Sequence, residues 1–118
     1  MINFNDAHTQ FVAYLSGKNR AESTILAYGK DIQQMLSHIE NEHGKTHVHH
    51  IETNDINSFL ELLEKEGYTK KSISRKINSI KTFFRFLKTN DFVIDDPSAI
   101  ITHPKFQTPP PRILSKTE

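Results

Sequence analysis

A run of basic residues is the feature of this sequence with the clearest chemical meaning. Residues 69–90, TKKSISRKINSIKTFFRFLKTN, contain seven Lys and Arg residues and no Asp or Glu. The other 96 residues carry eight basic and fourteen acidic side chains, so the net charge of +1 conceals a strongly polarised chain. A concentrated positive face attracts polyanions even when the average charge is small.

The polar residues within this run indicate what such a face would bind. At 100° per residue, an apolar stripe of Ile73, Ile77, Ile80 and Phe84 lies opposite a polar face formed by Lys71, Arg75, Asn78 and Thr82, with Ser74, Lys81 and Arg85 on a flank. A solvated helix usually mixes charges, because opposite charges four residues apart stabilise it. Lys and Arg combined with Ser, Asn and Thr suit phosphate contacts and base-edge hydrogen bonds in a major groove. The run also fits an ordinary solvated helix face, and charge alone does not separate the two interpretations.

Four helices are predicted to position this face. Apolar residues recur at helical spacing over about 5–16, over 23 or 24 to 42, from Thr53 to just before Gly67, and over 70–88. The predicted core-facing residues are Phe11, Tyr14, Leu15, Ile25, Tyr28, Ile32, Met35, Leu36, Ile39, Ile56, Phe59, Leu60, Leu63, Ile73, Ile77, Ile80, Phe84 and Leu87. Four such stripes bury one another, so we expect one all-α domain with short connections.

The sequence changes character after Asn90. FVIDDPSAII predicts a short helix that begins at Asp96-Pro97, and the proline-rich THPKFQTPPPR predicts an extended linker. We therefore expect a domain over residues 1–103, followed by a tail over residues 104–118.

The second predicted helix has a compatible polar surface. Opposite its apolar stripe lie Ser23, Ala27, Lys30, Gln34 and Ser37, which are small or polar enough to admit a nearby nucleic-acid backbone. Ser23 and Thr24 stand near the start of the helix, where their hydroxyls suit either a phosphate or an ordinary N-cap. Gly29, inside the same helix, predicts close packing against a neighbour.

Composition argues against several other classes of protein. There is no cysteine, and no basic leader or apolar run long enough to span a membrane, which predicts a soluble cytoplasmic chain without thiol chemistry. No glycine-rich phosphate loop or interpretable catalytic spacing is present, so we expect no catalysis within these residues. The histidines 43, 47, 49 and 50 suggest a metal-binding site, because imidazole is a common zinc ligand. They alternate with Val48 and Ile51, however, and this pattern favours a polar connection that these two apolar residues anchor.

Several stretches, in order, resemble the N-terminal core-binding domain of tyrosine recombinases, the phage integrases and Xer-type enzymes. They are FVAYL, AESTILAYGKDIQQMLSHI, HIETNDINSFL, TKKSISRKINSIKTFFRFL and DDPSAII, and together they cover nearly the whole chain. The most specific pieces are Ser-Thr followed by Tyr28 and Asp31, and the spacing of Ser72, Arg75, Ser79, Lys81 and Phe83-Phe84. The resemblance implies a SAM-like bundle that grips one face of duplex DNA during DNA integration and recombination, while a separate catalytic domain grips the other.

The resemblance also implies what this chain leaves out. PRILSKTE resembles the opening of the catalytic domain, so the family's catalytic Arg, Lys, His and Tyr residues would lie in sequence beyond Glu118. Two positions depart from the family's usual residues, namely Asp96 in place of Asn and Lys81 where Arg is common, and Lys81 suits a phosphate better than a bidentate guanine contact.

The predicted partners are double-stranded DNA and, in the full-length complex, other recombinase protomers. We expect the isolated chain to be a monomer with no membrane contact, metal or cofactor. The residues expected to bind DNA are Ser23, Thr24, Lys30, Lys70, Lys71, Ser72, Arg75, Asn78, Lys81 and Thr82. We expect about four to six of the cations Lys30, Lys70, Lys71, Arg75, Lys76, Lys81 and Arg85 to lie near phosphates.

Two other classes of function fit parts of the sequence. SAM-like bundles also serve as protein-interaction modules, and Glu61, Glu64 and Glu66 on the third predicted helix would suit a basic protein partner. A free-standing helix-turn-helix regulator is a weaker alternative, because its recognition helix is usually shorter. Salt separates DNA binding from a mainly apolar protein interface, since only the former weakens steeply with ionic strength.

Overall fold

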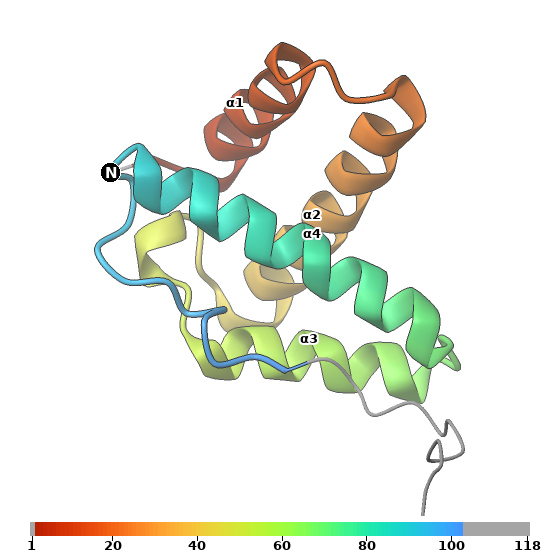
Figure 1. The fold of residues 1–118 in the computed structure, drawn as a ribbon. Helices are drawn as coiled ribbons and strands as arrows, with labels where there is room; N and C mark the ends of the chain where they lie inside the picture. The colour runs from red at the N-terminus through yellow and green to blue at the C-terminus, as the bar shows by residue number, and fades with distance from the viewer. Residues whose placement is uncertain (1, 103–118) are drawn as a thin grey trace, which may run out of the picture.

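The computed structural model describes residues 2–102, and within them the chain folds as four α-helices joined by short connections (Figure 1). The helices are α1 (Phe4–Gly17), α2 (Glu22–His43), α3 (Thr53–Lys65) and α4 (Lys70–Thr89), with a single 3₁₀ turn, η1 (Val48–His50), before α3. The all-α bundle of four main helices expected from the sequence is confirmed, and each predicted helix lies within two residues of its predicted bounds.

The helix ends follow from local capping chemistry. The side chain of Asn3 accepts a hydrogen bond from the Asp6 amide at 2.8 Å and starts α1. Glu52 and Asp55 form a reciprocal capping box at the start of α3. At the other end of α2, Gly44 adopts a left-handed φ of 67°, a conformation that glycine reaches without the steric cost of a side chain. The long helices therefore start and stop where their sequences supply caps.

Helix α2 is the central element of the bundle. It packs against α1, α3 and α4, and Figure 1 shows α4 crossing in front of it while α1 runs alongside. Gly29 of α2 allows close approach to α1, where the His8 ring lies 2.8 Å from the Gly29 carbonyl oxygen. The prediction of close packing at this glycine is confirmed.

The core contains the apolar stripes predicted from periodicity. Phe11 of α1 meets the ring of Phe83 of α4 edge-on at 5.1 Å, and Ile77 and Phe84 of α4 are buried. Tyr14, Ile25, Tyr28 and Leu60 are half-buried at the edge of this core, and the other predicted core residues are buried. Val48 and Ile51 are also buried, which confirms that they anchor the connection before α3. The polar face of α4 is consequently fixed by the apolar face beneath it.

The segment after α4 differs from its prediction. Residues 97–100 form turns rather than a short helix, with the Ala99 amide bonded to the Asp96 carbonyl and the Ile101 amide bonded to the Ser98 carbonyl. One carboxylate oxygen of Asp96 accepts hydrogen bonds from both the amide and the hydroxyl of Ser98, at 2.8 and 2.6 Å. Asp96 therefore holds a local turn that competes with helix formation. The predicted tail over residues 104–118 lies outside the described residues.

Candidate nucleic-acid interface

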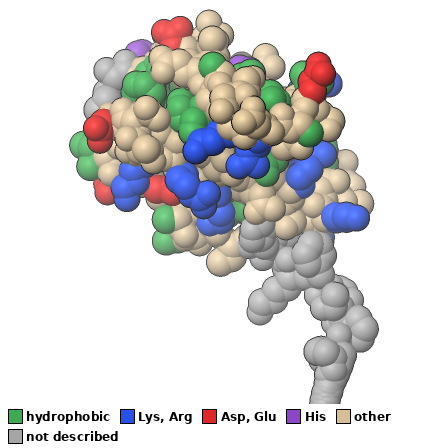
Figure 2. All heavy atoms as spheres, turned by 45° about the horizontal axis from the view of Figure 1, so that its top comes forward, with side chains coloured by type: hydrophobic (Ala, Val, Ile, Leu, Met, Phe, Trp, Pro, Cys, Tyr) green, Lys and Arg blue, Asp and Glu red, His purple; other side chains and the backbone are tan. Residues whose placement is uncertain are grey.

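The outer face of α4 carries most of the predicted DNA-binding residues. Thr69 caps the helix by accepting a hydrogen bond from the Ser72 amide, and Lys70, Lys71, Arg75 and Asn78 follow as exposed residues. Ser72 and Thr82 are half-buried beside them. Figure 2 shows Lys and Arg side chains gathered in a band across one face of the molecule. The predicted phase of α4 is therefore confirmed, because these positions face away from the core.

Two basic residues of α4 are not available as the sequence suggested. Lys76 is buried, with 6% of its surface exposed, and its ammonium group bonds to the Asp31 carboxylate at 2.9 Å. Of the seven candidate phosphate contacts, Lys76 is therefore one whose charge is turned into the bundle. Lys81 is half-buried and donates a hydrogen bond to the Ser98 carbonyl at 2.8 Å, so it is already engaged in the fold.

The first turn of α2 contains two of the predicted DNA-binding residues, Ser23 and Thr24. The N-cap is Ala21, which supplies no side-chain hydrogen bond, so the expected alternative role of Ser23 or Thr24 as the N-cap is wrong. Ser23 is exposed and Thr24 is half-buried within the first turn. The start of α2 thus has backbone amides that no side chain caps, beside two hydroxyl groups, although Glu22 places a negative charge in the same turn.

A hollow between α2 and α4 brings residues of the two helices together. Its volume is about 530 Å³, and its lining includes Ala27 and Lys30 from α2, Arg75 and Lys76 from α4, and Tyr68 from the preceding turn. Lys30 is exposed, and the Arg75 side chain is 52% exposed. The structure therefore places two predicted DNA-binding cations, one from each helix, around a single depression.

Sequence reasoning missed the buried residues that organise this hollow. Asp31 is 1% exposed and accepts hydrogen bonds from Arg75, Lys76 and Ser79 of α4. Gln34 extends this group by accepting from Lys76 and donating to the Tyr68 hydroxyl. A signal was present in the sequence, because Asp31 and Lys76 each sit beside a core isoleucine on the inward side of their helices.

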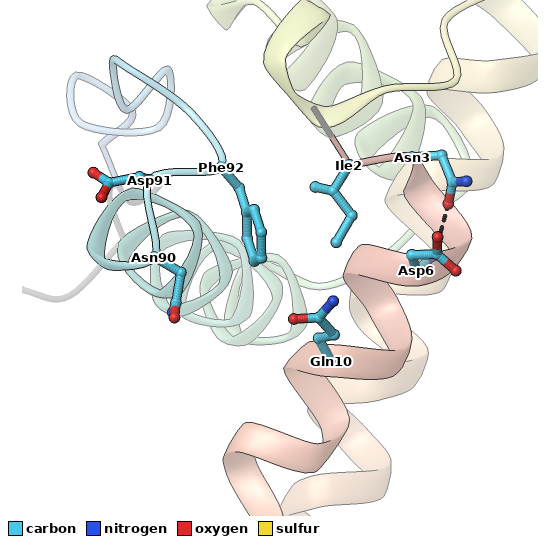
Figure 3. Close-up of a pocket in the computed structure, with 7 residues that line it drawn as sticks. All are labelled: Ile2, Asn3, Asp6, Gln10, Asn90, Asp91 and Phe92. Carbon is cyan, nitrogen blue, oxygen red and sulfur yellow. Dashed lines mark hydrogen bonds between the residues drawn. The ribbon is translucent and has the colours of Figure 1, made fainter.

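A second large hollow has a different character (Figure 3). It measures about 520 Å³ and lies between the start of α1 and the residues that follow α4. Ile2, Gln10 and Phe92 turn their side chains toward it, whereas the Asp91 carboxylate points away. Its lining has no Lys or Arg, and its charged members are Asp6 and Asp91. This hollow therefore does not suit an anionic ligand.

The histidines lie mainly around η1 and the α2–α3 junction. The rings of His49 and His50 lie 4.0 Å apart between centroids, and partial desolvation together with His50 lowers the pKa of His49. His38 of α2 lies 3.2 Å from the Ser58 hydroxyl, and burial lowers its pKa although Glu42 acts in the opposite direction. Among residues 2–102, no three His, Asp or Glu side chains converge as metal ligands would.

Helix α3 presents a surface of opposite charge to α4. Glu61 and Glu64 are exposed on the helix and Glu66 is exposed just beyond it, as the sequence predicted. The two helices pack against each other, so the bundle has acidic and basic surfaces on neighbouring elements. Neither helix, nor any other in the described part of the chain, is both long and apolar enough to cross a membrane.

The fold and its close likeness among solved structures define a SAM-like helical bundle. The N-terminal domain of a phage integrase/site-specific recombinase from Haloarcula marismortui superposes with a TM-score of 0.77 at 11% sequence identity, over 87% of this chain and 97% of that one. Residues 9–91 match the family described as the phage integrase N-terminal SAM-like domain. The chain belongs to this family, which confirms the resemblance drawn from its sequence.

The curated relatives that the chain resembles include tyrosine recombinases. It is 32% identical over 114 residues to a tyrosine recombinase of Thermosipho africanus, which covers 92% of this chain and 38% of the relative. It is 31% identical over 119 residues to tyrosine recombinase XerC of Anoxybacillus flavithermus, which covers 100% of this chain and 39% of that protein. The chain thus spans little more than a third of the length of the relatives it matches.

Proposed function

We propose that this chain is the DNA-binding domain of a site-specific tyrosine recombinase and grips one face of duplex DNA at the recombination site. The observation that carries the proposal is the outer face of α4. Lys71, Arg85 and Lys88 of α4 are exposed and make no ion pair among residues 2–102, and α4 contains no acidic residue. Exposed cations favour a polyanion when, as among residues 2–102, no acidic side chain pairs with them.

The other proposed contacts follow from the position of each residue. Lys70, Lys71, Arg75 and Lys30 would meet phosphates, while Asn78, exposed in the middle of α4, would reach a base edge. Ser23, Thr24, Ser72 and Thr82 would add hydroxyl contacts at the margins. Lys81 would contact DNA only by releasing the Ser98 carbonyl.

The rest of the proposal concerns the longer protein. We assign the DNA-binding domain to residues 1–103, and the interdomain linker together with the start of a catalytic domain to residues 104–118. Strand cleavage would then require that catalytic sequence, and the domain alone would bind DNA without cutting it. Other recombinase protomers would join it on the DNA in the cytoplasm, whereas the isolated domain would be a monomer.

An NMR titration of the 118-residue chain with a short duplex tests the proposal. Amide shifts confined to α2 and α4, and suppressed when salt is raised, are the expected result. Lys71→Glu should weaken binding strongly, whereas Lys65→Glu, which makes the same charge change at the end of α3, should have little effect. No shifts at low salt would refute the proposal.

A protein-docking role is the second candidate, and the exposed acidic side chains of α3 are the observation that favours it. Shifts centred on Glu61 and Glu64 upon addition of a basic protein, together with no response to DNA, would support this role instead.

A further inference from the structure

One buried carboxylate links the two helices of the proposed DNA-binding face. Asp31 of α2 is 1% exposed, and the three hydrogen bonds that its side chain accepts within residues 2–102 all come from α4. Arg75 and Lys76 donate to one carboxylate oxygen, each at 2.9 Å, and the Ser79 hydroxyl donates to the other at 2.8 Å. Two cations therefore share one anion beneath the α2–α4 hollow.

The two cations stand in different environments, which separates their roles. Lys76 neutralises Asp31 from inside the bundle, because its side chain is 8% exposed and its ammonium also bonds to the Gln34 carbonyl oxygen. A buried carboxylate needs a partner of this kind. The Arg75 side chain is 52% exposed, so water can solvate its guanidinium group. Arg75 therefore does not need the bond to Asp31 to avoid a buried, unpaired charge.

The bond to Asp31 instead fixes the Arg75 guanidinium at the wall of the hollow. Among the described residues only one of its five N–H donors, on Nη2, is engaged, which leaves the others available to a ligand. Lys30 lines the same hollow from α2 and is exposed. Three positive residues, Lys30, Arg75 and Lys76, and one negative residue, Asp31, line the hollow, so its net charge is positive. The groups that donate hydrogen bonds to Asp31 also shield its carboxylate.

We propose that this hollow seats one backbone phosphate of the bound duplex, with Arg75 and Lys30 as its contacts and Asp31 as the positioning residue that orients Arg75. The inference rests on the proposed DNA-binding function. A guanidinium recognises phosphate through two parallel hydrogen bonds, and that geometry requires a fixed plane. A long Arg side chain held in advance by Asp31 loses less freedom when the phosphate arrives.

The direction in which one substitution changes DNA affinity separates a positioning role of Asp31 from a purely electrostatic one. Asp31→Asn removes a negative charge from the hollow while nearly preserving the shape of the side chain. If Asp31 acted only through its charge, this variant would bind DNA more tightly. If Asp31 positions Arg75, the variant binds more weakly although the protein has become more positive.

The experiment is a double-mutant cycle on the 118-residue chain. Dissociation constants for a fluorescent duplex are measured by anisotropy, at one low salt concentration, for the original chain, Asp31→Asn, Arg75→Ala and the double variant. Asp31→Asn should weaken binding by about three- to tenfold on its own, the range expected of coupled neighbours. It should cause no further loss in the Arg75→Ala background, because the residue it positions is gone.

Two further variants keep the result interpretable if Asp31→Asn is poorly folded. Asp55→Asn is a matched control, because Asp55 is also buried and bonds to Lys45, away from the hollow. It should lower the melting temperature and leave DNA binding unchanged in the folded protein. Arg75→Lys keeps the charge but not the planar fork, so it should weaken binding several-fold while circular dichroism shows a folded helical protein.

Each outcome bears on a different claim. Tighter or unchanged binding by Asp31→Asn, an equal loss in both backgrounds, or normal binding by Arg75→Lys would overturn the positioning role. Normal binding by Arg75→Ala would overturn the phosphate seat itself. No binding by the original chain at low salt would overturn the DNA-binding function on which both rest.

Discussion

The salt dependence of DNA binding should reveal how many cations of this face meet phosphates. Five of the exposed cations along α2 and α4 are predicted phosphate contacts, namely Lys30, Lys70, Lys71, Arg75 and Arg85, whereas Lys76 is buried and Lys81 is bonded to Ser98. Each neutralised phosphate contributes roughly −0.9 to the slope of log affinity against log salt, so five contacts give about −4.5. A fourfold rise in salt should then weaken binding by about 500-fold.

Single substitutions test the assignment behind that count. Lys71→Ala should flatten the slope by about 0.9, because it removes one phosphate contact. Lys76→Met makes the same change in charge at a buried position and should leave the slope as it was. Fluorescence anisotropy at four or more salt concentrations measures both variants. A slope flatter than about −2 for the original chain, or equal changes in the two variants, would refute the reasoning.

Three further predictions concern stability. Ile77→Ala or Phe84→Ala should lower the free energy of unfolding by about 2 to 5 kcal/mol through cavity formation, whereas Ile94→Ala, at a residue that is 80% exposed, should change it by less than about 0.5 kcal/mol in urea titrations. Gly44→Ala should cost about 1 to 2 kcal/mol because of its left-handed φ, whereas Gly29→Ala, which adds a methyl group at ordinary contact distance from Val12, should cost less by the same measurement. Because the folded state lowers the pKa of His38, it binds fewer protons there than the unfolded chain, so stability should fall as pH drops below about 6.5, and His38→Gln should reduce that fall in thermal melts. An equal melting temperature of the original chain well above and well below about pH 6.5 would contradict the prediction for His38.

The helices could be predicted from the spacing of apolar residues, because all the residues on one face of a helix are buried together. Ile73, Ile77 and Ile80 recur at helical spacing, and that pattern fixes which side of α4 faces the core whatever element covers it. The polar face followed from the same phase, so most of the candidate site could be predicted from the order of residues along α4.

The ion pairs could not be predicted in the same way, because they depend on which helices meet and at what register. Lys76 looks like one more surface cation until α2 places Asp31 beside it. Lys81 likewise seems free until residues 97–100 turn back and present the Ser98 carbonyl. In both cases the partner is remote in sequence, so the local pattern can mark Lys76 as inward-facing but does not identify the residue to which either lysine bonds.

The hydrogen bonds around residues 97 and 98 have a mechanical consequence. Thr53 of α3 donates to the Pro97 carbonyl and Lys81 of α4 donates to the Ser98 carbonyl, each at 2.8 Å. The path of the chain is thereby pinned to two helices just before residue 102. A domain joined beyond this point would be tethered at a fixed position on the bundle. The tether would confine that domain to a smaller volume and so raise its effective concentration at DNA bound to α4. If a DNA phosphate drew Lys81 away, the hydrogen bond to the Ser98 carbonyl would be lost and only the bond from Thr53 to the Pro97 carbonyl would remain. DNA binding would then also increase the volume accessible to the attached domain.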